Sequence, residues 1–218
     1  MKLIARVAAS ALAVAVLVAQ PVPQARAATL PDGLQKITVV AHSPTSSYAW
    51  LSTWKSSGGR WVRALPGPWT ARVGYNGVAP PGAERENSGR TPSGSYTLGF
   101  MFGALPRPSG IVWPTWRHAY GYDVWDDDPA SPRYNLWTDD RTQDAGRSPE
   151  PMRTIPQYDY AVVINYNTAR TPGLGSAIFL HVSYNDPTAG CVSLPAAELL
   201  AVLRWLRSAA HPYITIRA

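Results

Sequence analysis

Cysteine is almost absent from this sequence, since Cys191 is the only one among 218 residues. A lone thiol cannot close an internal disulfide, so the fold must be stabilised by packing. The chain is long enough for one domain with a substantial apolar core. Neither a disulfide nor a structural metal is therefore required for stability.

Long runs of one charge are also missing. The 20 basic and 14 acidic residues give a net charge of +6, and no basic segment long enough to indicate nucleic-acid binding is present. The other histidines, His42, His118 and His211, are scattered rather than paired as zinc ligands are. Three consecutive aspartates at residues 126–128 are more typical of a solvated loop than of a metal site. We predict no metal and no organic cofactor.

The first 27 residues have the pattern of a signal peptide. A basic start precedes an apolar stretch at residues 8–19, which is shorter than the roughly 20 residues that cross a bilayer. Cleavage near Ala27 removes three bases and no acid, which leaves 17 bases against 14 acids and a net charge of +3. We expect a secreted, periplasmic or cell-wall-associated protein with no transmembrane segment in the mature chain. The alternative is an uncleaved membrane anchor.

The mature part, residues 28–218, alternates short strand patterns with frequent proline and glycine. Apolar or alternating runs bounded by turn residues predict strands at residues 37–41, 48–54, 60–64, 69–75, 95–100, 160–166, 177–182 and 213–216. Apolar residues with helical spacing predict one helix at residues 195–208. The predicted fold class is mainly β, a mixed sheet with one helix after Cys191, in a single domain.

Residues 103–157 show no sustained periodicity, although they contain four tryptophans and eight prolines. A segment of this length without structure of its own is uncommon inside a compact domain. We interpret it as a cap that packs on the sheet. Two roles remain open, because the cap either lines a substrate site or only covers an apolar sheet face.

The surroundings of Cys191 suggest that its thiol is reactive. An unpaired cysteine in an exported protein indicates an intermolecular bond or a reactive thiol. His181 stands ten positions upstream at the end of an apolar run, and Gly190 directly precedes the sulfur. A nucleophilic cysteine needs a base within reach, and backbone N–H groups near the thiol can stabilise an oxyanion. The alternative is an inert buried cysteine beside a structural histidine.

The sequence around these residues resembles the L,D-transpeptidase catalytic domain, also called YkuD-like. The resemblance rests on His181 followed by Thr188-Ala189-Gly190-Cys191-Val192. Two segments upstream are also similar to the family, residues 73–77 and residues 89–96. The second contains Thr-Pro-Ser-Gly at residues 91–94, which predicts a β-turn that feeds a strand. The three features occur in the family's order.

The resemblance implies an enzyme that acts on peptidoglycan stem peptides. Cys191 would attack an L,D-linked peptide bond, and the resulting acyl-enzyme would pass to a diaminopimelate amine to form a 3→3 cross-link. His181 would be the base, oriented by a backbone carbonyl at residue 182 or 183. Thr188 and Gly190, with the amide of Cys191, would shape the oxyanion site. Carbapenems would be covalent inhibitors.

Two positions depart from the commoner family pattern. Ala189 replaces a histidine, and Ser193 replaces an arginine or asparagine. Arg90, Arg133 or Arg141 are the candidates to supply the missing cation. Two alternatives to a transpeptidase stay open on the sequence. The first is an L,D-carboxypeptidase or other wall-peptide hydrolase, in which water accepts the acyl group. The second is a wall-binding module that has lost its activity.

Overall fold

The computed structural model describes residues 33–218, so the predicted signal peptide at residues 1–27 lies outside the described residues. The strands are β1 (Gln35–Ala41), β2 (Tyr48–Ser57), β3 (Arg60–Arg63), β4 (Trp69–Arg72), β5 (Val78–Ala79), β6 (Thr91–Pro92), β7 (Gly94–Gly103), β8 (Trp116–His118), β9 (Asp123–Asp126), β10 (Leu136–Asp139), β11 (Glu150–Pro151), β12 (Ala161–Ile164), β13 (Phe179–Val182), β14 (Val192–Leu194) and β15 (Tyr213–Arg217). The helical elements are α1 (Ala196–Trp205) and a 3₁₀ turn (Ser208–Ala210). The fold is mainly β, as predicted.

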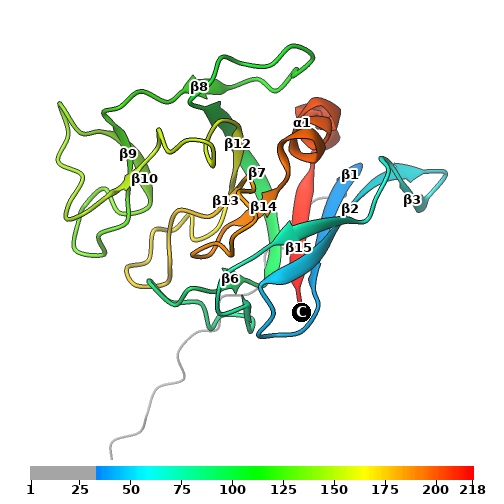
Figure 1. Cartoon of the computed structure of the whole chain (residues 1–218), viewed down its shortest axis with the longest axis horizontal. Coiled ribbons are helices and arrows are strands. Elements are labelled where there is room, and N and C mark those ends of the chain that lie inside the picture. The colour runs from blue at the N-terminus through cyan, green and yellow to red at the C-terminus, as the bar shows by residue number, and fades with distance from the viewer. Residues whose placement is uncertain (1–32) are drawn as a thin grey trace, which may run out of the picture.

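The main sheet closes on itself. Its strands pair in the order β1-β15-β7-β12-β13-β14-β4-β2, and β2 pairs again with β1. Most neighbours are antiparallel, but β1 with β15 and β13 with β14 are parallel. The closed path removes free edges from these eight strands, which otherwise invite unwanted pairing. Figure 1 shows β12, β13 and β14 between the rest of this sheet and the cap.

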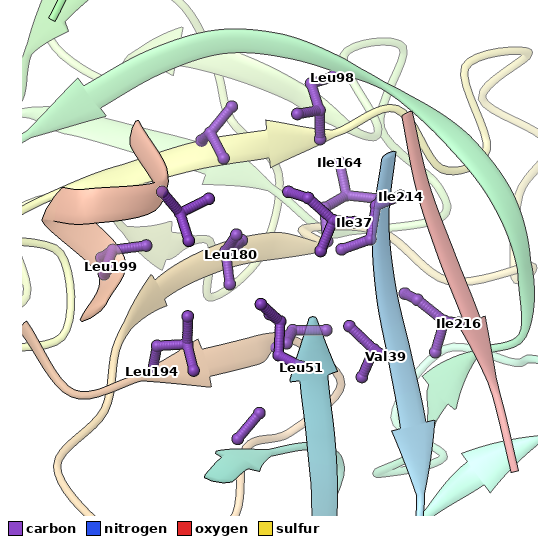
Figure 2. Close-up of a cluster of buried hydrophobic side chains, with 14 of the residues drawn as sticks. Ile37, Val39, Leu51, Leu98, Ile164, Leu180, Leu194, Leu199, Ile214 and Ile216 are labelled. Carbon is purple, nitrogen blue, oxygen red and sulfur yellow. The ribbon is translucent and has the colours of Figure 1, made fainter. Parts of the chain in front are cut away.

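The interior of the closed sheet is the main apolar core. In β1 the burial alternates residue by residue, and Ile37 and Val39 are fully buried. This period of two is what a strand with one core-facing side requires. Leu180 of β13 and Leu194 of β14 point into the same core, together with Leu51 (Figure 2).

Helix α1 follows β14 and closes one side of this core. Pro195 occupies its N-cap position, where the missing N–H of proline does no harm, and Glu198 lies in the first turn. The helix buries Leu199, Val202 and Leu203 against the core. It is shorter than the predicted 195–208, because Leu206 adopts an extended conformation with ψ of 138°. No helix among residues 33–218 is long and apolar enough to cross a membrane.

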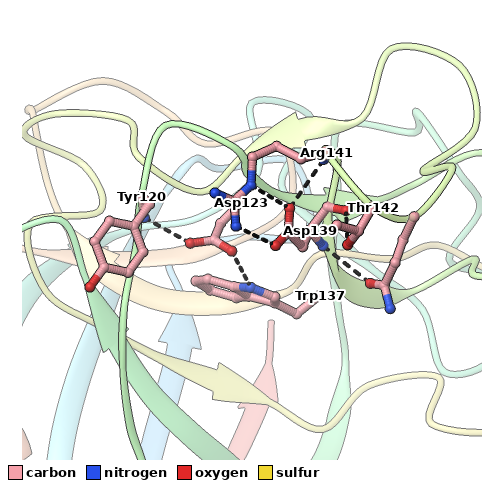
Figure 3. A network of polar contacts seen from close by, with 7 residues as sticks. Tyr120, Asp123, Trp137, Asp139, Arg141 and Thr142 are labelled. Carbon is pink, nitrogen blue, oxygen red and sulfur yellow. Dashed lines mark hydrogen bonds and ion pairs between the residues drawn. The ribbon is translucent and has the colours of Figure 1, made fainter.

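The cap contains more order than the sequence predicted. Residues 103–157 include the short strands β8 to β11, and β10-β9-β11 form a separate three-stranded sheet. Figure 3 shows the polar network that ties this small sheet together. Asp123 accepts hydrogen bonds from the Tyr120 amide at 2.8 Å and the Trp137 indole at 3.0 Å. Arg141 binds the carboxylate of Asp139 through two nitrogens.

The cap packs on the outer face of the closed sheet. A second apolar cluster joins the two parts, and its buried members are Phe102, Ala119, Trp125, Met152, Tyr158, Ala161, Val163, Ala177, Phe179 and Cys191. Rings from both parts meet edge to face, for example Trp125 with Phe179 at 5.0 Å. The aromatic residues of the cap therefore cover the sheet face that carries Cys191.

Two local predictions were wrong. The aspartates at residues 126–128 are not a solvated loop, since Asp126 is fully buried and accepts hydrogen bonds from Ser131 and the Asp128 amide. Residues 91–94 are not a β-turn, since Thr91 and Pro92 form β6 and pair in parallel with β5. Both errors arose from strand pairings that local sequence does not reveal, of β9 with β10 and β11 and of β6 with β5.

The closed core leads to a prediction about the free energy of unfolding. Replacement of Leu180 by alanine should lower the free energy of unfolding by about 2–5 kcal/mol, because a fully buried leucine leaves a cavity. Urea unfolding followed by circular dichroism measures this change. Leu105→Ala is the control, since Leu105 is 37% exposed and its loss should change stability by under about 1 kcal/mol. Equal effects of the two variants would contradict the assignment of the core.

Candidate active site

Strands β13 and β14 bring the predicted nucleophile and base to one face. In their parallel register Leu180 lies opposite Val192 and His181 opposite Ser193. Side chains alternate between the two faces of a strand. Leu180 and Val192 belong to the inner core, whereas Cys191 belongs to the cap-facing cluster. The alternation therefore puts Cys191 and His181 together on the cap-facing side.

The thiol of Cys191 is held by the backbone of the segment that leads into β13. Its Sγ lies 3.3 Å from the Phe179 amide, which donates to it, and 3.2 Å from the Ala177 carbonyl, which accepts from it. Ala177 adopts a left-handed conformation with φ of 53°, an unusual backbone state for a residue other than glycine. The thiol is thus fixed in both its donor and acceptor roles.

The surroundings favour the neutral thiol. Burial raises the pKa of Cys191 above its usual value, and the negative charge of Glu150 raises it further. Hydrogen bonds from the Phe179 amide and the Tyr158 side chain oppose this rise. The free protein therefore holds Cys191 as a thiol rather than as a thiolate.

His181 is also neutral. Its Nδ1 lies 2.8 Å from the Val182 carbonyl, and because a carbonyl only accepts, Nδ1 must carry the proton. The lone pair is then on Nε2, as a general base requires. Burial lowers the pKa of His181 to about 4, although backbone hydrogen bonds oppose the shift. The predicted orientation by a carbonyl at residue 182 or 183 is confirmed for Val182.

The structure adds two residues that the sequence did not indicate, Tyr158 and Glu150. The Tyr158 ring meets the His181 ring edge to face at 5.3 Å, and its hydroxyl interacts with the thiol of Cys191. The same hydroxyl donates a short hydrogen bond to Glu150. Burial raises the pKa of Glu150 to about 7, with further contributions from neighbouring acids. Both residues lie in or directly after the segment without periodicity, so no motif marked them.

The loop before Cys191 is fixed by its threonine and glycine. The Thr188 hydroxyl donates a hydrogen bond to the Cys191 carbonyl at 2.6 Å. The same hydroxyl accepts a hydrogen bond from the Gly190 amide at 3.3 Å. Thr91 donates to the same Cys191 carbonyl at 3.2 Å. A Cβ on Gly190 would lie 3.2 Å from the Arg90 carbonyl, so the glycine permits this close approach.

A cavity of about 280 Å³ opens at these residues. It is lined by Cys191, His181 and the loop at residues 186–190, together with cap residues. Of the three candidate arginines, Arg90 lines the cavity, whereas Arg133 bonds to Thr138 and Arg141 to Asp139. Ser193 lines it too, and its buried hydroxyl has no hydrogen-bond partner among residues 33–218. Ala189 forms another part of the rim.

Comparison with known families agrees with this geometry. The model of the L,D-transpeptidase catalytic domain, YkuD, matches residues 39–213. The chain belongs to this family. No curated protein matches the sequence. The matched region contains the cap, the cavity with Cys191 and most of the closed sheet, from within β1 to the first residue of β15. The family comprises enzymes that act on peptidoglycan peptides.

The resting site of this family member holds a neutral thiol and a neutral imidazole. Two neutral groups suit proton transfer during attack better than a permanent thiolate–imidazolium pair. The apolar cluster around Cys191 explains the preference, since burial penalises both charged forms. A substrate carbonyl in the cavity would then draw the proton from sulfur to His181 as the new bond forms.

This electrostatic arrangement predicts slow alkylation of Cys191 at neutral pH. The rate with iodoacetamide should rise steadily from pH 7 to 10 and stay at least about tenfold below that of free cysteine at pH 7. In Glu150→Gln the rate at pH 9 should be about three- to tenfold higher, because removal of the charge lowers the thiol pKa. Below pH 6 the two proteins should react alike, since Glu150 with a pKa of about 7 is then protonated.

Intact-mass kinetics measure these rates, and Asp140→Asn is the control for loss of one exposed acid. A rate plateau at neutral pH in the unmodified protein would contradict the neutral pair. Equal rates for Glu150→Gln and the unmodified protein at pH 9 would show that Glu150 does not act on the thiol.

Proposed function

We propose that this protein is an exported L,D-transpeptidase that cross-links peptidoglycan stem peptides through an acyl-enzyme on Cys191. The main support for this proposal is the cavity that Cys191 and His181 share. The thiol is hydrogen-bonded to the backbone, and Nδ1 of His181 bonds to the Val182 carbonyl. Residues 1–27 act as the signal peptide, and residues 28–218 form the single catalytic domain. The protein therefore works at the cell wall, on the peptides that its family acts on.

Acylation begins with attack of the Cys191 sulfur on the carbonyl carbon of the L,D-linked bond. His181 takes the thiol proton on Nε2 as the carbon–sulfur bond forms. The oxyanion accepts hydrogen bonds from donors in the loop that Thr188 and Gly190 fix around Cys191. When the tetrahedral intermediate collapses, the bond to the terminal D-alanine breaks and its nitrogen takes the proton from His181.

Transfer reverses these roles. The side-chain amine of a second stem peptide attacks the thioester carbon and gives a proton to His181. The carbon–sulfur bond breaks, the sulfur takes that proton back, and a 3→3 peptide cross-link results. The enzyme returns to its neutral thiol and neutral imidazole, so no charge is left in the apolar site.

Covalent trapping tests the nucleophile. A carbapenem should add one molecule per protein on incubation, because its strained amide acylates the thiol without needing a peptide leaving group. Cys191→Ala should form no adduct, and His181→Gln should form it about 10²- to 10⁴-fold more slowly. Intact-mass spectrometry counts the adducts, and melting temperatures check that the variants fold. Absence of an adduct on the unmodified protein would favour a binding module without catalysis.

Product analysis tests transfer against hydrolysis. The unmodified protein, given disaccharide tetrapeptides, should produce cross-linked dimers and free D-alanine, whereas Cys191→Ala should produce neither. Liquid chromatography with mass spectrometry separates dimers from tripeptides. Tripeptides without any dimer, even at millimolar acceptor, would identify a wall-peptide hydrolase that passes the same acyl group to water.

A further inference from the structure

The cavity at Cys191 has a strongly acidic part that the acyl-transfer steps do not use. Glu84 and Glu86 enter it from the segment between β5 and β6, and Asp127 enters it from the end of β9. These segments are far apart in the sequence, and the fold brings them to one wall of the cavity. We refer to Glu84, Glu86 and Asp127 as the acidic wall.

Glu84 is the residue of this wall that most needs a partner. Its side chain is only 6% exposed, and Oε1 accepts a hydrogen bond from Ser88 at 2.6 Å. Its other oxygen, Oε2, is buried and has no hydrogen-bond partner among residues 33–218. A buried carboxylate oxygen without a partner is costly, so the site lacks a donor that a ligand can provide.

Glu86 is held in place rather than free to turn away. Its carboxylate accepts hydrogen bonds from the Tyr134 hydroxyl and from Ser176, the latter at 3.1 Å. Tyr134 belongs to the cap and Ser176 to the segment before β13, so both parts of the fold fix this carboxylate. Neutral hydroxyl donors leave its negative charge uncompensated.

Basic side chains do not neutralise the wall. The ion pairs found within residues 33–218 are Arg141–Asp139 and Arg147–Asp128, and neither involves the acidic wall. Other charged residues on the cavity are the acids Glu150 and Asp186 and the bases Arg85 and Arg90. The Arg85 guanidinium donates to backbone carbonyls at residues 82 and 84 instead of to a carboxylate. Five acids therefore face two bases.

Burial, and after it mutual repulsion, raises the pKa of two acids of the wall. Burial raises the pKa of Asp127 to about 6, and the charges of Glu86 and its neighbouring aspartates add to the rise. The pKa of Glu84 is raised as well, by burial and then by Glu86, although Ser88 and Arg90 oppose it. A cation placed between these groups would relieve both desolvation and repulsion.

The free acceptor of the wall, Oε2 of Glu84, suits an organic cation as its donor. Within residues 33–218 no group of three acid, histidine or cysteine side chains is arranged to hold a metal ion. A primary ammonium carries three donors that diverge from one nitrogen, so it can bond to the unpartnered Oε2 of Glu84 and to a second carboxylate of the wall. Peptide substrates with a diamino acid carry such a group.

We propose that Glu84, Glu86 and Asp127 form a binding subsite for a primary ammonium group of the peptide substrate. The inference deepens the proposed function and rests on it, since it assumes that peptides enter this cavity. The ammonium belongs either to the side chain of the acyl donor or to the incoming acceptor amine. In the second case the wall holds the amine close to the thioester before it loses its proton to His181.

Binding to an inactive protein tests the subsite without requiring any acyl transfer. In a Cys191→Ala background, calorimetry compares a stem tetrapeptide whose side-chain amine is free with the same peptide acetylated on that amine. The free amine should bind about 10- to 100-fold more tightly, as expected for hydrogen bonds to charged groups. Glu84→Gln and Asp127→Asn should each reduce this preference at least about threefold, and the double variant should abolish it.

Asp140→Asn is the matched control, because it removes one exposed acid outside the cavity and should keep the full preference. Glu86→Gln is a second cavity variant in case Glu84→Gln does not fold, as judged by its melting temperature. Equal binding of the free and acetylated peptides, or a preference that survives in the double variant, would overturn the proposal.

The active protein then distinguishes the two sources of the ammonium. If the donor supplies it, acetylation of the donor amine should slow acylation of Cys191 at least about tenfold, and Glu84→Gln should remove this difference. If the acceptor supplies it, Glu84→Gln should raise the KM for the acceptor about tenfold with unchanged acylation. A protein that shows the binding preference but never acylates would refute the proposed function and leave the subsite standing.

Discussion

The parallel pairing of β13 with β14 is the constraint on which the site depends. Its register sets Leu180 beside Val192 in the inner core and His181 beside Ser193 on the cap side. Because side chains alternate along both strands, a shift by one residue would exchange the two faces. It would bury His181 in the apolar core and take Leu180 out of it. Core packing and the position of the site are therefore fixed by the same hydrogen-bond ladder.

Burial on the cap side decides the charge state of the site. Cys191 lies in a cluster of aromatic and aliphatic side chains, which disfavours a thiolate and an imidazolium alike. Backbone groups hold the two side chains in place. The Phe179 amide donates to the thiol, and Nδ1 of His181 bonds to the Val182 carbonyl. The protein thus keeps both groups neutral and oriented by backbone hydrogen bonds in one cavity. Glu150 of the cap and Tyr158, which follows it, add a hydrogen-bonded polar pair to this apolar setting.

The two parts of the fold contribute differently. The closed sheet and α1 form a core of interlocked aliphatic side chains that positions β13 and β14. The cap rests on the outer face of that sheet through aromatic rings and supplies Glu150 and one member of the acidic wall, Asp127, while Tyr158 follows directly after it. The proposed nucleophile and base are therefore carried by the sheet and the loop before β14, whereas the acids of the cavity come from the cap and from the segment between β5 and β6.

The sequence by itself determined the fold class, the helix after Cys191, most central strands and the family, because these depend on local periodicity and a short motif. It also singled out Cys191, His181, Thr188 and Gly190, which are close in the chain. Only the tertiary structure revealed the closure of the sheet by β1 and β2, the small sheet of the cap and β6. It alone brought Glu150, Tyr158 and the acidic wall to the cysteine. These depend on pairing and burial between distant segments, and no local pattern encodes such contacts.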